Sequence, residues 1–234
     1  RRESFSAQCD QQTGDIHAER DAIPESGRDG PSDNPLGIDH MQENVTGLIL
    51  AGGKNSRMGV NKAFLEIDGK RLMDRTLSVY RRIFPKIIIV TNDPLAYVEF
   101  SEAMIVTDIY KGKGSLGGIY TGLFYAASDD CFVAACDMPC LNEDFIRYMI
   151  GRRRSYDIIV PELSEGFQAL HAIYSRRCLA VMKKMILADR LKIAGLFKDM
   201  HTLRLTEEDI RPFAGNTPLF TNINTPQDLQ SFRK

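Results

Sequence analysis

An apolar run leads directly into a loop of glycines and cations at Leu48-Ile-Leu-Ala-Gly-Gly-Lys-Asn-Ser-Arg-Met-Gly-Val-Asn-Lys62. Paired glycines carry no Cβ atoms, so a ligand can lie against the backbone and its phosphate oxygens can meet free amide N–H groups. Arg57 presents a planar fork suited to two oxygens, whereas Lys62 supplies a compact point charge. The stretch therefore predicts a strand followed by a phosphate-binding loop; the alternative is a plain strand-loop-helix connection with solvated cations.

Two familiar nucleotide motifs describe this chain poorly. The Walker pattern is absent, because no Gly-Lys-Ser or Gly-Lys-Thr follows the glycines. A formal G-x-G-x-x-G occurs at 112–117, but a dinucleotide fingerprint should follow the first strand tightly, and here Asp108-Ile-Tyr-Lys intervenes after a third strand. We interpret Lys111 to Gly118 instead as a flexible flap over a nucleotide, ending at a helix N-terminus whose amides favour anions.

Short apolar runs alternate with longer amphipathic segments along the body of the chain. The runs predict strands at Val45–Leu50, Lys86–Thr91, Ala103–Val106, Phe132–Cys136 and Asp157–Val160. The amphipathic segments predict helices at Leu72–Phe84, Gly118–Ala127 and Asn142–Arg153, the last with Asn142 as its N-cap. This alternation predicts an α/β fold with a mainly parallel sheet and helices on both of its faces.

Polar residues follow successive predicted strands. The glycine-rich loop follows the first strand, Asn92 the second, Asp108 the third and Asp137 the fourth. In an open parallel sheet, ligands bind at the carboxyl ends of the strands, near the point where the strand order reverses. We therefore expect one shared cleft. Asp137 offers the hard oxygen that Mg²⁺ prefers; the alternative is an Asp-x-Pro turn that caps its own loop.

Length and composition indicate one domain of about 190 residues with a tail. The 234 residues are 43% hydrophobic and carry a net charge of −1, which argues against a nucleic-acid-binding protein. No apolar run approaches the roughly 20 residues needed to span a bilayer. A secretory signal is not recognisable either, so we expect a cytoplasmic protein with no membrane partner.

The cysteines do not indicate a metal site. Cys131, Cys136 and Cys140 form C-x4-C-x3-C, and no histidine stands at a usual zinc spacing from them. Cys131 and Cys136 are five residues apart on a predicted strand and so should point to opposite faces. We interpret them as thiols of the core, because free cysteine is among the most buried residue types.

Three separate motifs resemble those of the molybdenum cofactor guanylyltransferases, the MobA family. They are Leu50-Ala-Gly-Gly53 with Arg57-Met-Gly59 and Lys62, then Cys136-Asp-Met-Pro139, and finally Asn222-Ile-Asn-Thr-Pro226. The resemblance covers roughly residues 45 to 233 with matching order and spacing. One departure is Asn61, where the family usually has Asp, and this leaves the role of that acid open here. Val60 in place of a frequent glycine is a milder change.

The resemblance implies a three-layer Rossmann-like nucleotidyltransferase fold with a mainly parallel central sheet. It also implies transfer of GMP from GTP to the terminal phosphate of molybdopterin, with release of pyrophosphate and with Mg²⁺ as the metal. The implied catalytic residues are Lys62, Arg57 and Asp137, of which Asp137 holds the metal. The implied ligand contacts are Leu50, Ala51, Gly52, Gly53, Lys62, Asn92, Asp108, Asp137, His171, Asn222 and Asn224.

Some of these contacts have a second interpretation. His171 could bind a phosphate or the pterin, but a lone histidine in an apolar strand is more often a core residue. Thr225-Pro226 by itself predicts a helix N-cap and first turn, but this leaves Asn222 and Asn224 unexplained, and they should lie at a strand end facing the cleft.

Two other function classes remain open from the sequence. A molybdopterin cytidylyltransferase or another transferase of this fold would share the glycine-rich loop and the Mg²⁺ acid. A non-catalytic molybdopterin carrier would have no use for Arg57, Lys62 and Asp137 together. The expected partners are GTP and molybdopterin or molybdenum cofactor, with cofactor biosynthesis proteins and apo-molybdoenzymes as further candidates.

Residues 1–40 differ in kind from the rest of the chain. They are rich in Asp, Glu, Ser, Gly and Arg and show no sustained apolar period, which predicts disorder. Residues 41–234 are predicted to form a single nucleotidyltransferase domain, and we expect the functional chain to begin near Met41.

Overall fold

The computed structural model describes residues 45–52, 61–215, 219–223 and 228. The chain divides into two units, residues 1–35 and 36–234, and every described residue belongs to the second. The predicted N-terminal extension and the predicted helix start at Thr225-Pro226 both lie outside the described residues.

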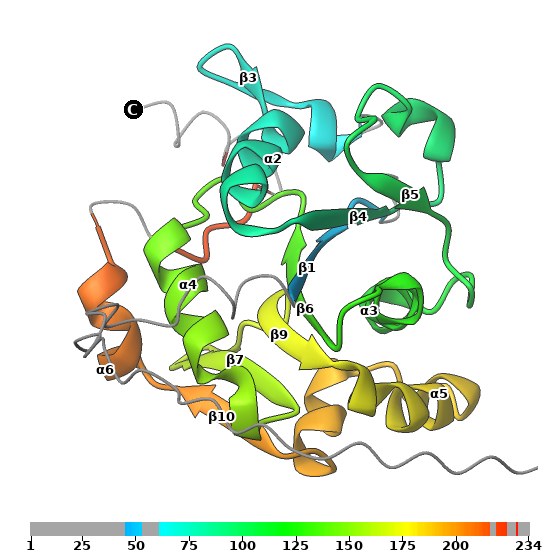
Figure 1. Ribbon diagram of the computed structural model, residues 1–234, viewed down its shortest axis with the longest axis vertical. Coiled ribbons are helices and arrows are strands. Elements are labelled where there is room, and N and C mark those ends of the chain that lie inside the picture. The colour runs from blue at the N-terminus through cyan, green and yellow to red at the C-terminus, as the bar shows by residue number, and fades with distance from the viewer. Residues whose placement is uncertain (1–44, 53–60, 216–218, 224–227, 229–234) are drawn as a thin grey trace, which may run out of the picture. The chain divides into compact units, whose positions relative to one another are not determined.

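A sheet of eight strands forms the centre of the described region (Figure 1). Its order is β10-β7-β9-β6-β1-β4-β5, with β8 paired to β7. The strands are β1 (Val45–Leu50), β4 (Lys86–Val90), β5 (Met104–Val106), β6 (Asp130–Ala135), β7 (Ile158–Leu163), β8 (Gly166–Phe167), β9 (His171–Ser175) and β10 (Thr202–Leu205). Strand β1 is parallel to β4 and β6, and β4 to β5, whereas β9 runs antiparallel to β6 and β7. The predicted α/β fold with a mainly parallel sheet is confirmed.

Helices cover both faces of this sheet, as predicted (Figure 1). Helices α2 (Leu72–Ile83) and α4 (Glu143–Arg152) lie on one face, and α3 (Gly114–Tyr125) and α5 (Leu179–Leu187) lie on the other. Strand β1 shows why: Ile49 belongs to the apolar cluster under α2 and α4, and Leu48 belongs to the cluster under α3 and α5. Because successive side chains of a strand point to opposite faces, an apolar run buries a side chain on each.

Short elements complete the described chain. They are the hairpin β2 (Glu66–Ile67) and β3 (Lys70–Arg71), helix α6 (Glu207–Ile210) and the 3-10 turns η2 (Lys62–Phe64), η3 (Pro94–Tyr97), η4 (Arg153–Ser155), η5 (Arg176–Cys178), η6 (Ile193–Lys198) and η7 (Arg211–Phe213). The predicted cap of α4 is confirmed, because the Asn142 side chain accepts a hydrogen bond from Phe145 N at 2.9 Å.

The predicted flap at 111–118 is corrected by the structure. Helix α3 begins at Gly114, four residues before its predicted start, and a turn with Gly112 at φ +74° precedes it. A Cβ added at Gly118 would lie 3.1 Å from Leu50 Cδ2. Gly114 and Gly117 of the G-x-G-x-x-G segment therefore belong to a helix, and the next residue, Gly118, packs closely on β1.

The predicted opposite faces and core positions of Cys131 and Cys136 are confirmed. Cys131 is buried in the cluster under α3 and α5, and Cys136 packs against the cluster on the opposite face. Burial raises the pKa of both thiols to about 12, so both stay protonated. Nowhere in the described chain do three or more His, Cys, Asp or Glu side chains group so as to hold a metal ion.

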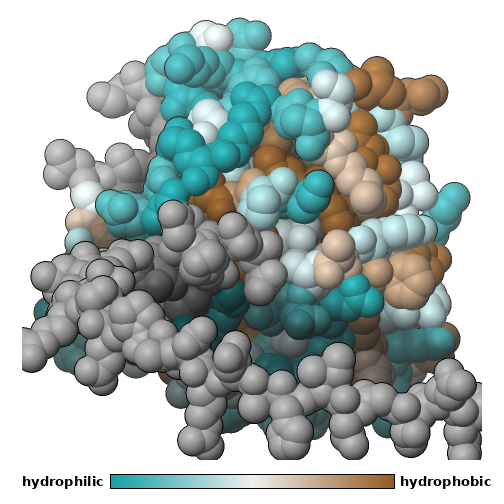
Figure 2. Space-filling view, in the orientation of Figure 1, coloured by the Kyte–Doolittle hydropathy of each residue, from teal (hydrophilic) through white to brown (hydrophobic). Residues whose placement is uncertain are grey.

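In the described region, no helix is both long enough and apolar enough to cross a membrane. Apolar side chains gather on the face seen in Figure 2, at the upper right over η3 and β5, where Leu95, Val98 and Met104 are exposed.

Candidate functional site

A pocket of about 200 Å³ opens at the carboxyl ends of β1 and β6. The end of β1 contributes Leu50, Ala51 and Gly52 to its wall. Asp137, directly after β6, and Lys62, the first residue of η2, face each other across it. The pocket thus brings together five of the residues that the sequence predicted for one shared site.

Lys62 and Asp137 form an ion pair, with Lys62 Nζ 3.2 Å from Asp137 Oδ2. Their side chains are 27% and 20% exposed, so both charges stay within reach of a ligand. Ile223 also holds the loop after β6, because its backbone N donates a hydrogen bond to the Asp137 backbone carbonyl at 2.9 Å. Ile223 is buried beside Ile67 and Leu72, which docks this residue next to the acid.

Asn92 and Asp108 form a second polar pair, at the ends of β4 and β5. Asn92 Nδ2 donates to Asp108 Oδ2 at 3.0 Å. Asp108 Oδ1 is buried and has no hydrogen-bond partner among the described residues. Burial raises the pKa of Asp108, and the Asn92 amide counters it. A buried carboxylate oxygen without a partner is an acceptor prepared for a ligand's donor.

Gly52 links the pocket to this polar pair. A Cβ added at Gly52 would lie 3.4 Å from Asn92 Nδ2 and 3.8 Å from Asn92 N. The exposed Gly52 backbone therefore borders both polar pairs. It lines the pocket together with Lys62 and Asp137, and it lies close to Asn92, which pairs with Asp108. A single extended ligand lying along Gly52 can reach both pairs.

The structure places His171 inside the core and away from the pocket surface. Its side chain is fully buried among Phe132, Phe145 and Phe220, with ring centroids 5.0, 5.7 and 5.2 Å away. Burial lowers its pKa to about 3, so the ring is neutral. Leu170, its neighbour in the chain, is the residue that lines the pocket.

The remaining predicted residues divide into two groups. Asn222 is exposed one position before Ile223, on the segment that docks beside Asp137. Gly53, Arg57 and Asn224 lie outside the described residues.

Sequence reasoning missed several residues at or behind the pocket, among them Ala135 and Leu170, which line it. Ser115, in the first turn of α3, lines the wall, and its place after a glycine-rich turn was the available signal. Asn61, treated as a departure from a family pattern, also lines the wall. Tyr97 lies behind the wall and bonds to Asn61 and to the Ala51 carbonyl. No local pattern marks a tyrosine for such a role, because its partners lie 36 and 46 residues away.

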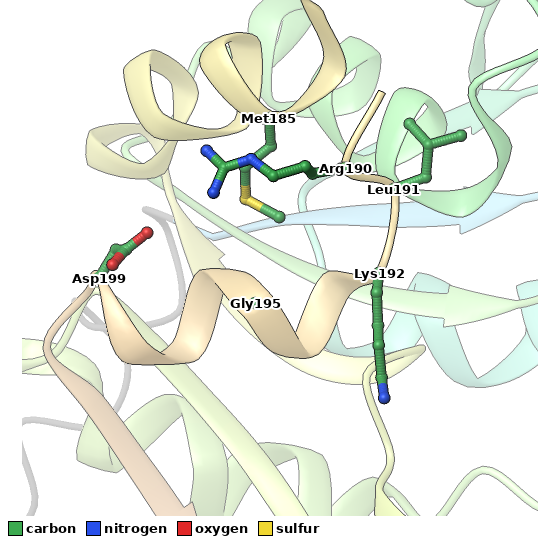
Figure 3. Close-up of a pocket in the computed structure, with 6 residues that line it drawn as sticks. All are labelled: Met185, Arg190, Leu191, Lys192, Gly195 and Asp199. Atoms are coloured by element: carbon green, nitrogen blue, oxygen red, sulfur yellow. The ribbon is translucent and has the colours of Figure 1, made fainter. Parts of the chain in front are cut away.

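A second pocket, of about 330 Å³, lies between α5 and η6 (Figure 3). Its lining includes Met185, Arg190 and Lys192, and in Figure 3 Arg190 lies beside Met185 while Lys192 points away from both. None of the residues predicted for the site lines it. We place the candidate site in the smaller pocket, where the motifs converge.

Comparison with known proteins identifies sequence relatives over most of this length. A family profile described as a MobA-like NTP transferase domain matches residues 47–202. A molybdenum cofactor guanylyltransferase from Desulfosudis oleivorans is 37% identical over 188 residues, which cover 80% of this chain and 93% of that protein. A probable molybdenum cofactor guanylyltransferase from Natranaerobius thermophilus is 34% identical over 199 residues, covering 83% and 97%.

Solved structures resemble the fold. Molybdopterin-guanine dinucleotide biosynthesis protein A from Archaeoglobus fulgidus superposes with a TM-score of 0.70 at 27% identity, covering 80% of this chain and 96% of that one. The 4-diphosphocytidyl-2C-methyl-D-erythritol synthase from Anaerococcus prevotii has a TM-score of 0.61 at 15% identity, covering 84% and 96%. The second likeness concerns the fold alone.

Proposed function

This chain belongs to the MobA-like NTP transferase family, and on that premise we propose that it transfers GMP from GTP to the terminal phosphate of molybdopterin or molybdenum cofactor. A phosphate oxygen of the acceptor attacks the α-phosphorus of GTP, the bond from that phosphorus to the bridging oxygen breaks, and pyrophosphate leaves with the electron pair. The observation that carries this proposal is the meeting of the β1 end, Lys62 and Asp137 in one pocket.

Phosphoryl chemistry of this kind depends on positioning and charge neutralisation more than on a covalent nucleophile. Leu50, Ala51 and Gly52 form the wall along which the nucleoside lies, with the Gly52 backbone open to the ligand. Lys62 meets the phosphates and stabilises the negative charge that develops there. Arg57 and Gly53, on the connection between Gly52 and Asn61, are proposed to assist at the phosphates.

Asp137 is the residue proposed to hold Mg²⁺. A carboxylate at the pocket wall fits this ion, which usually takes one or two carboxylates and fills its remaining positions with phosphate oxygens and water. When bound, Mg²⁺ neutralises phosphate charge and orients the leaving group. In the structure Asp137 Oδ2 instead faces Lys62 Nζ at 3.2 Å. A ligand that brings both a cation and phosphates supplies each member of this ion pair with a new partner.

The Asn92–Asp108 pair is proposed to recognise the base or the ribose. The partnerless Asp108 Oδ1 accepts a hydrogen bond, and ribose hydroxyls and the guanine N–H groups are donors. Asn92 orients the carboxylate through its bond to Oδ2. Because Gly52 lies beside Asn92, these contacts come at the opposite end of the ligand from Lys62.

Asn222 is proposed to bind the molybdopterin acceptor, because it precedes Ile223, which is hydrogen-bonded to Asp137. Asn224, two residues further along the sequence, is proposed to bind the acceptor as well. His171 has no place in it while its ring stays in the core, although Leu170 contributes to the wall. Molybdenum cofactor biosynthesis proteins and apo-molybdoenzymes are proposed as the partners that supply the acceptor and receive the product.

The proposal is tested by thermal shift with Mg²⁺ and GTP, CTP, ATP or UTP, followed by pyrophosphate release with molybdopterin. We expect stabilisation by GTP in preference to the others. Asp137→Asn and Lys62→Ala should each slow turnover by about 10²–10³-fold, since each removes charge stabilisation. The matched control is Asp189→Asn, because Asp189 pairs with Lys113 at 2.9 Å on the surface and lines neither pocket.

Other outcomes assign a different function. Preference for CTP or UTP would make the protein a sister transferase. Tight molybdopterin binding without pyrophosphate release would make it a carrier. Full turnover in Asp137→Asn would remove that residue from the mechanism.

A further inference from the structure

We propose that Tyr97 is a positioning residue for the nucleotide pocket, because its hydroxyl joins Ala51 at the end of β1 to Asn61 at the start of η2. The inference rests on the proposed function, since the pocket it positions is the one assigned to GTP. Tyr97 does not line that pocket, whereas Ala51 and Asn61 both do. Its effect on a ligand must therefore pass through those two residues.

The Tyr97 hydroxyl lies between the Asn61 amide and the Ala51 carbonyl. Asn61 Nδ2 donates to the Tyr97 oxygen at 3.0 Å. The hydroxyl has two acceptors within reach, Asn61 Oδ1 at 3.1 Å and the Ala51 carbonyl at 3.2 Å. Ala63 N donates to the same Asn61 Oδ1 at 3.2 Å, so that oxygen already has a donor. The bond to the Ala51 carbonyl is buried, where an unmade bond is costly.

Ala51 and Asn61, which Tyr97 joins, stand directly before two further residues of the pocket, Gly52 and Lys62. The Ala51 carbonyl belongs to the peptide bond that begins Gly52, so fixing it fixes the plane along which the ligand lies. Asn61 precedes Lys62 and caps the turn from which the ammonium reaches Asp137. One hydroxyl thus sets the spacing between the open backbone and the cation that meets phosphate.

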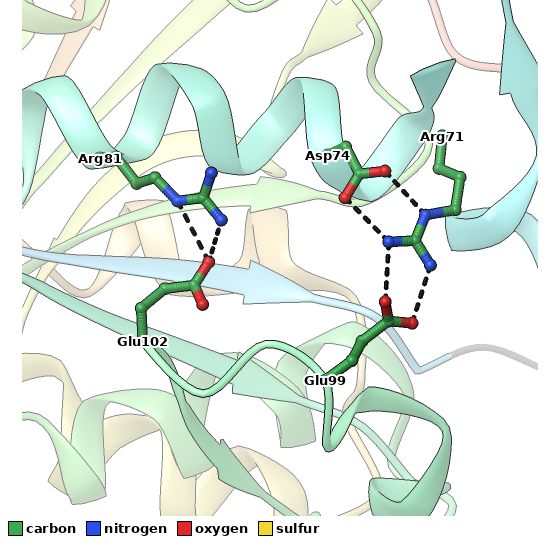
Figure 4. A network of polar contacts seen from close by, with 5 residues as sticks. All are labelled: Arg71, Asp74, Arg81, Glu99 and Glu102. Atoms are coloured by element: carbon green, nitrogen blue, oxygen red, sulfur yellow. Dashed lines mark hydrogen bonds and ion pairs between the residues drawn. The ribbon is translucent and has the colours of Figure 1, made fainter. Parts of the chain in front are cut away.

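The Tyr97 ring is itself held by its surroundings. It packs on Phe64 and Phe100, with ring centroids 5.3 and 6.2 Å away. The guanidinium of Arg71 lies 5.6 and 5.3 Å from the centroids of those two phenylalanine rings. Figure 4 shows Arg71 between Asp74 of α2 and Glu99, two residues after Tyr97. The segment that carries Tyr97 is in this way tied to helix α2.

Asn61 suits this arrangement better than an aspartate would. The Asn61 amide can donate to the hydroxyl through Nδ2, which leaves the hydroxyl proton for the Ala51 carbonyl. A carboxylate has no proton to donate and could only compete with that carbonyl for the single hydroxyl proton. Burial raises the pKa of Tyr97 to about 12, so the hydroxyl keeps that proton at neutral pH. The amide at position 61 therefore determines which oxygen the tyrosine binds.

Tyr97→Phe keeps the ring and removes the hydroxyl. We expect GTP to bind roughly three- to tenfold more weakly, the equivalent of one lost hydrogen bond. The matched control is Tyr80→Phe, because Tyr80 is also fully buried and its hydroxyl donates to the Leu48 carbonyl at 3.2 Å, three residues before Ala51 on the same strand. Both variants should lose similar thermal stability without ligand, and only Tyr97→Phe should lose GTP affinity.

Asn61 variants test the direction of the bonds. Asn61→Asp should weaken GTP binding, and combining Asn61→Ala with Tyr97→Phe should cost no more than the larger single change, because both break one chain of bonds. Wild-type affinity in Tyr97→Phe, or an equal loss in Tyr80→Phe, would overturn the inference.

A second readout does not need GTP. Amide hydrogen exchange of peptides covering residues 61–67 should be faster in ligand-free Tyr97→Phe than in Tyr80→Phe, because the Asn61 cap on Ala63 loses its support. If the wild type binds no GTP, the proposed function fails, and this exchange alone decides the inference. Equal exchange in the two variants would then overturn it.

Discussion

His171 is a polar side chain held in an aromatic cage. Both ring nitrogens are buried and have no hydrogen-bond partner among the described residues. Phe132 and Phe220 each meet the ring edge to face, and Phe145 lies nearly parallel to it. The neutral imidazole is favoured at this site over the charged one, because no described anion or hydrogen-bond acceptor would stabilise an added proton on the ring.

Acid should therefore destabilise the folded protein through His171. Its folded pKa of about 3 lies below the ordinary value of 6.5, so the unfolded state binds the proton first as the pH falls. Stability from this source is complete above pH 6.5 and is lost progressively towards pH 3. Between pH 7.5 and 5 the wild type should lose about 2 kcal/mol more than His171→Leu, as measured by urea unfolding.

A histidine at the surface provides the control for this experiment. His201 is exposed, with Nδ1 at 2.6 Å from the Ser155 carbonyl. His201→Gln should keep the wild-type pH dependence of stability. If His171→Leu loses stability with acid as steeply as the wild type does, His171 is not the source of the acid sensitivity.

At the scale of elements, the packing of α3 on β1 depends on a glycine. Gly122 lies in the middle of α3, and a Cβ added there would come 2.2 Å from Leu48 Cδ2. The helix thus approaches the central strand more closely than a side chain would allow. Leu50 and Ser115, at the ends of these same elements, line the pocket.

Gly122→Ala should destabilise the protein by about 1–3 kcal/mol, because the methyl group overpacks the contact with Leu48. Gly151→Ala is the matched control on another helix, since Gly151 lies in α4 and nothing lies within 4 Å of an added Cβ. That change should be neutral or stabilise by up to about 1 kcal/mol through helix propensity. Thermal and urea unfolding of both variants measure the difference, and equal effects would contradict the packing argument.

At the scale of the whole molecule, one strand in the path of the sheet, β9, runs against the others. Strands β6, β1, β4 and β5 run parallel and bring the candidate ligand contacts to their carboxyl ends. Strand β9 reverses direction and joins them to β7 and β10. The reversal places Leu170, just before β9, at the same edge as Asp137, just after β6.

The contacts that the structure describes at the site all involve residues between 45 and 223, and we expect residues 1–40 to be dispensable. Their composition predicts disorder, which contributes little buried apolar surface. A chain beginning at Met41 should keep the unfolding midpoint, the GTP affinity and the rate of pyrophosphate release of the full chain. A large loss of activity in that truncation would show that these residues take part in function.

Much of the fold could be predicted because its signals are local. The apolar run ending at Leu50, the Asn142 cap and the alternation of strands and helices each depend on neighbours within a few positions. Placing Asp108 and Asp137 at one edge followed from the geometry of parallel strands. The early start of α3 was missed because its glycines were taken for a loop, whereas the residue on which Gly118 packs, Leu50, lies far away in the chain.

The sequence by itself determined the α/β class, the strands at the centre of the sheet and the kinds of residue at the site, because periodicity and motif spacing report local chemistry. Only the tertiary structure decided that β9 runs antiparallel, that His171 lies in the core and that Tyr97 joins Ala51 to Asn61. These features depend on contacts between residues distant in sequence. Which distant residues meet is decided by how the whole chain packs, and many residues of similar polarity could fill each place. A pattern within a few positions of the sequence cannot specify that choice.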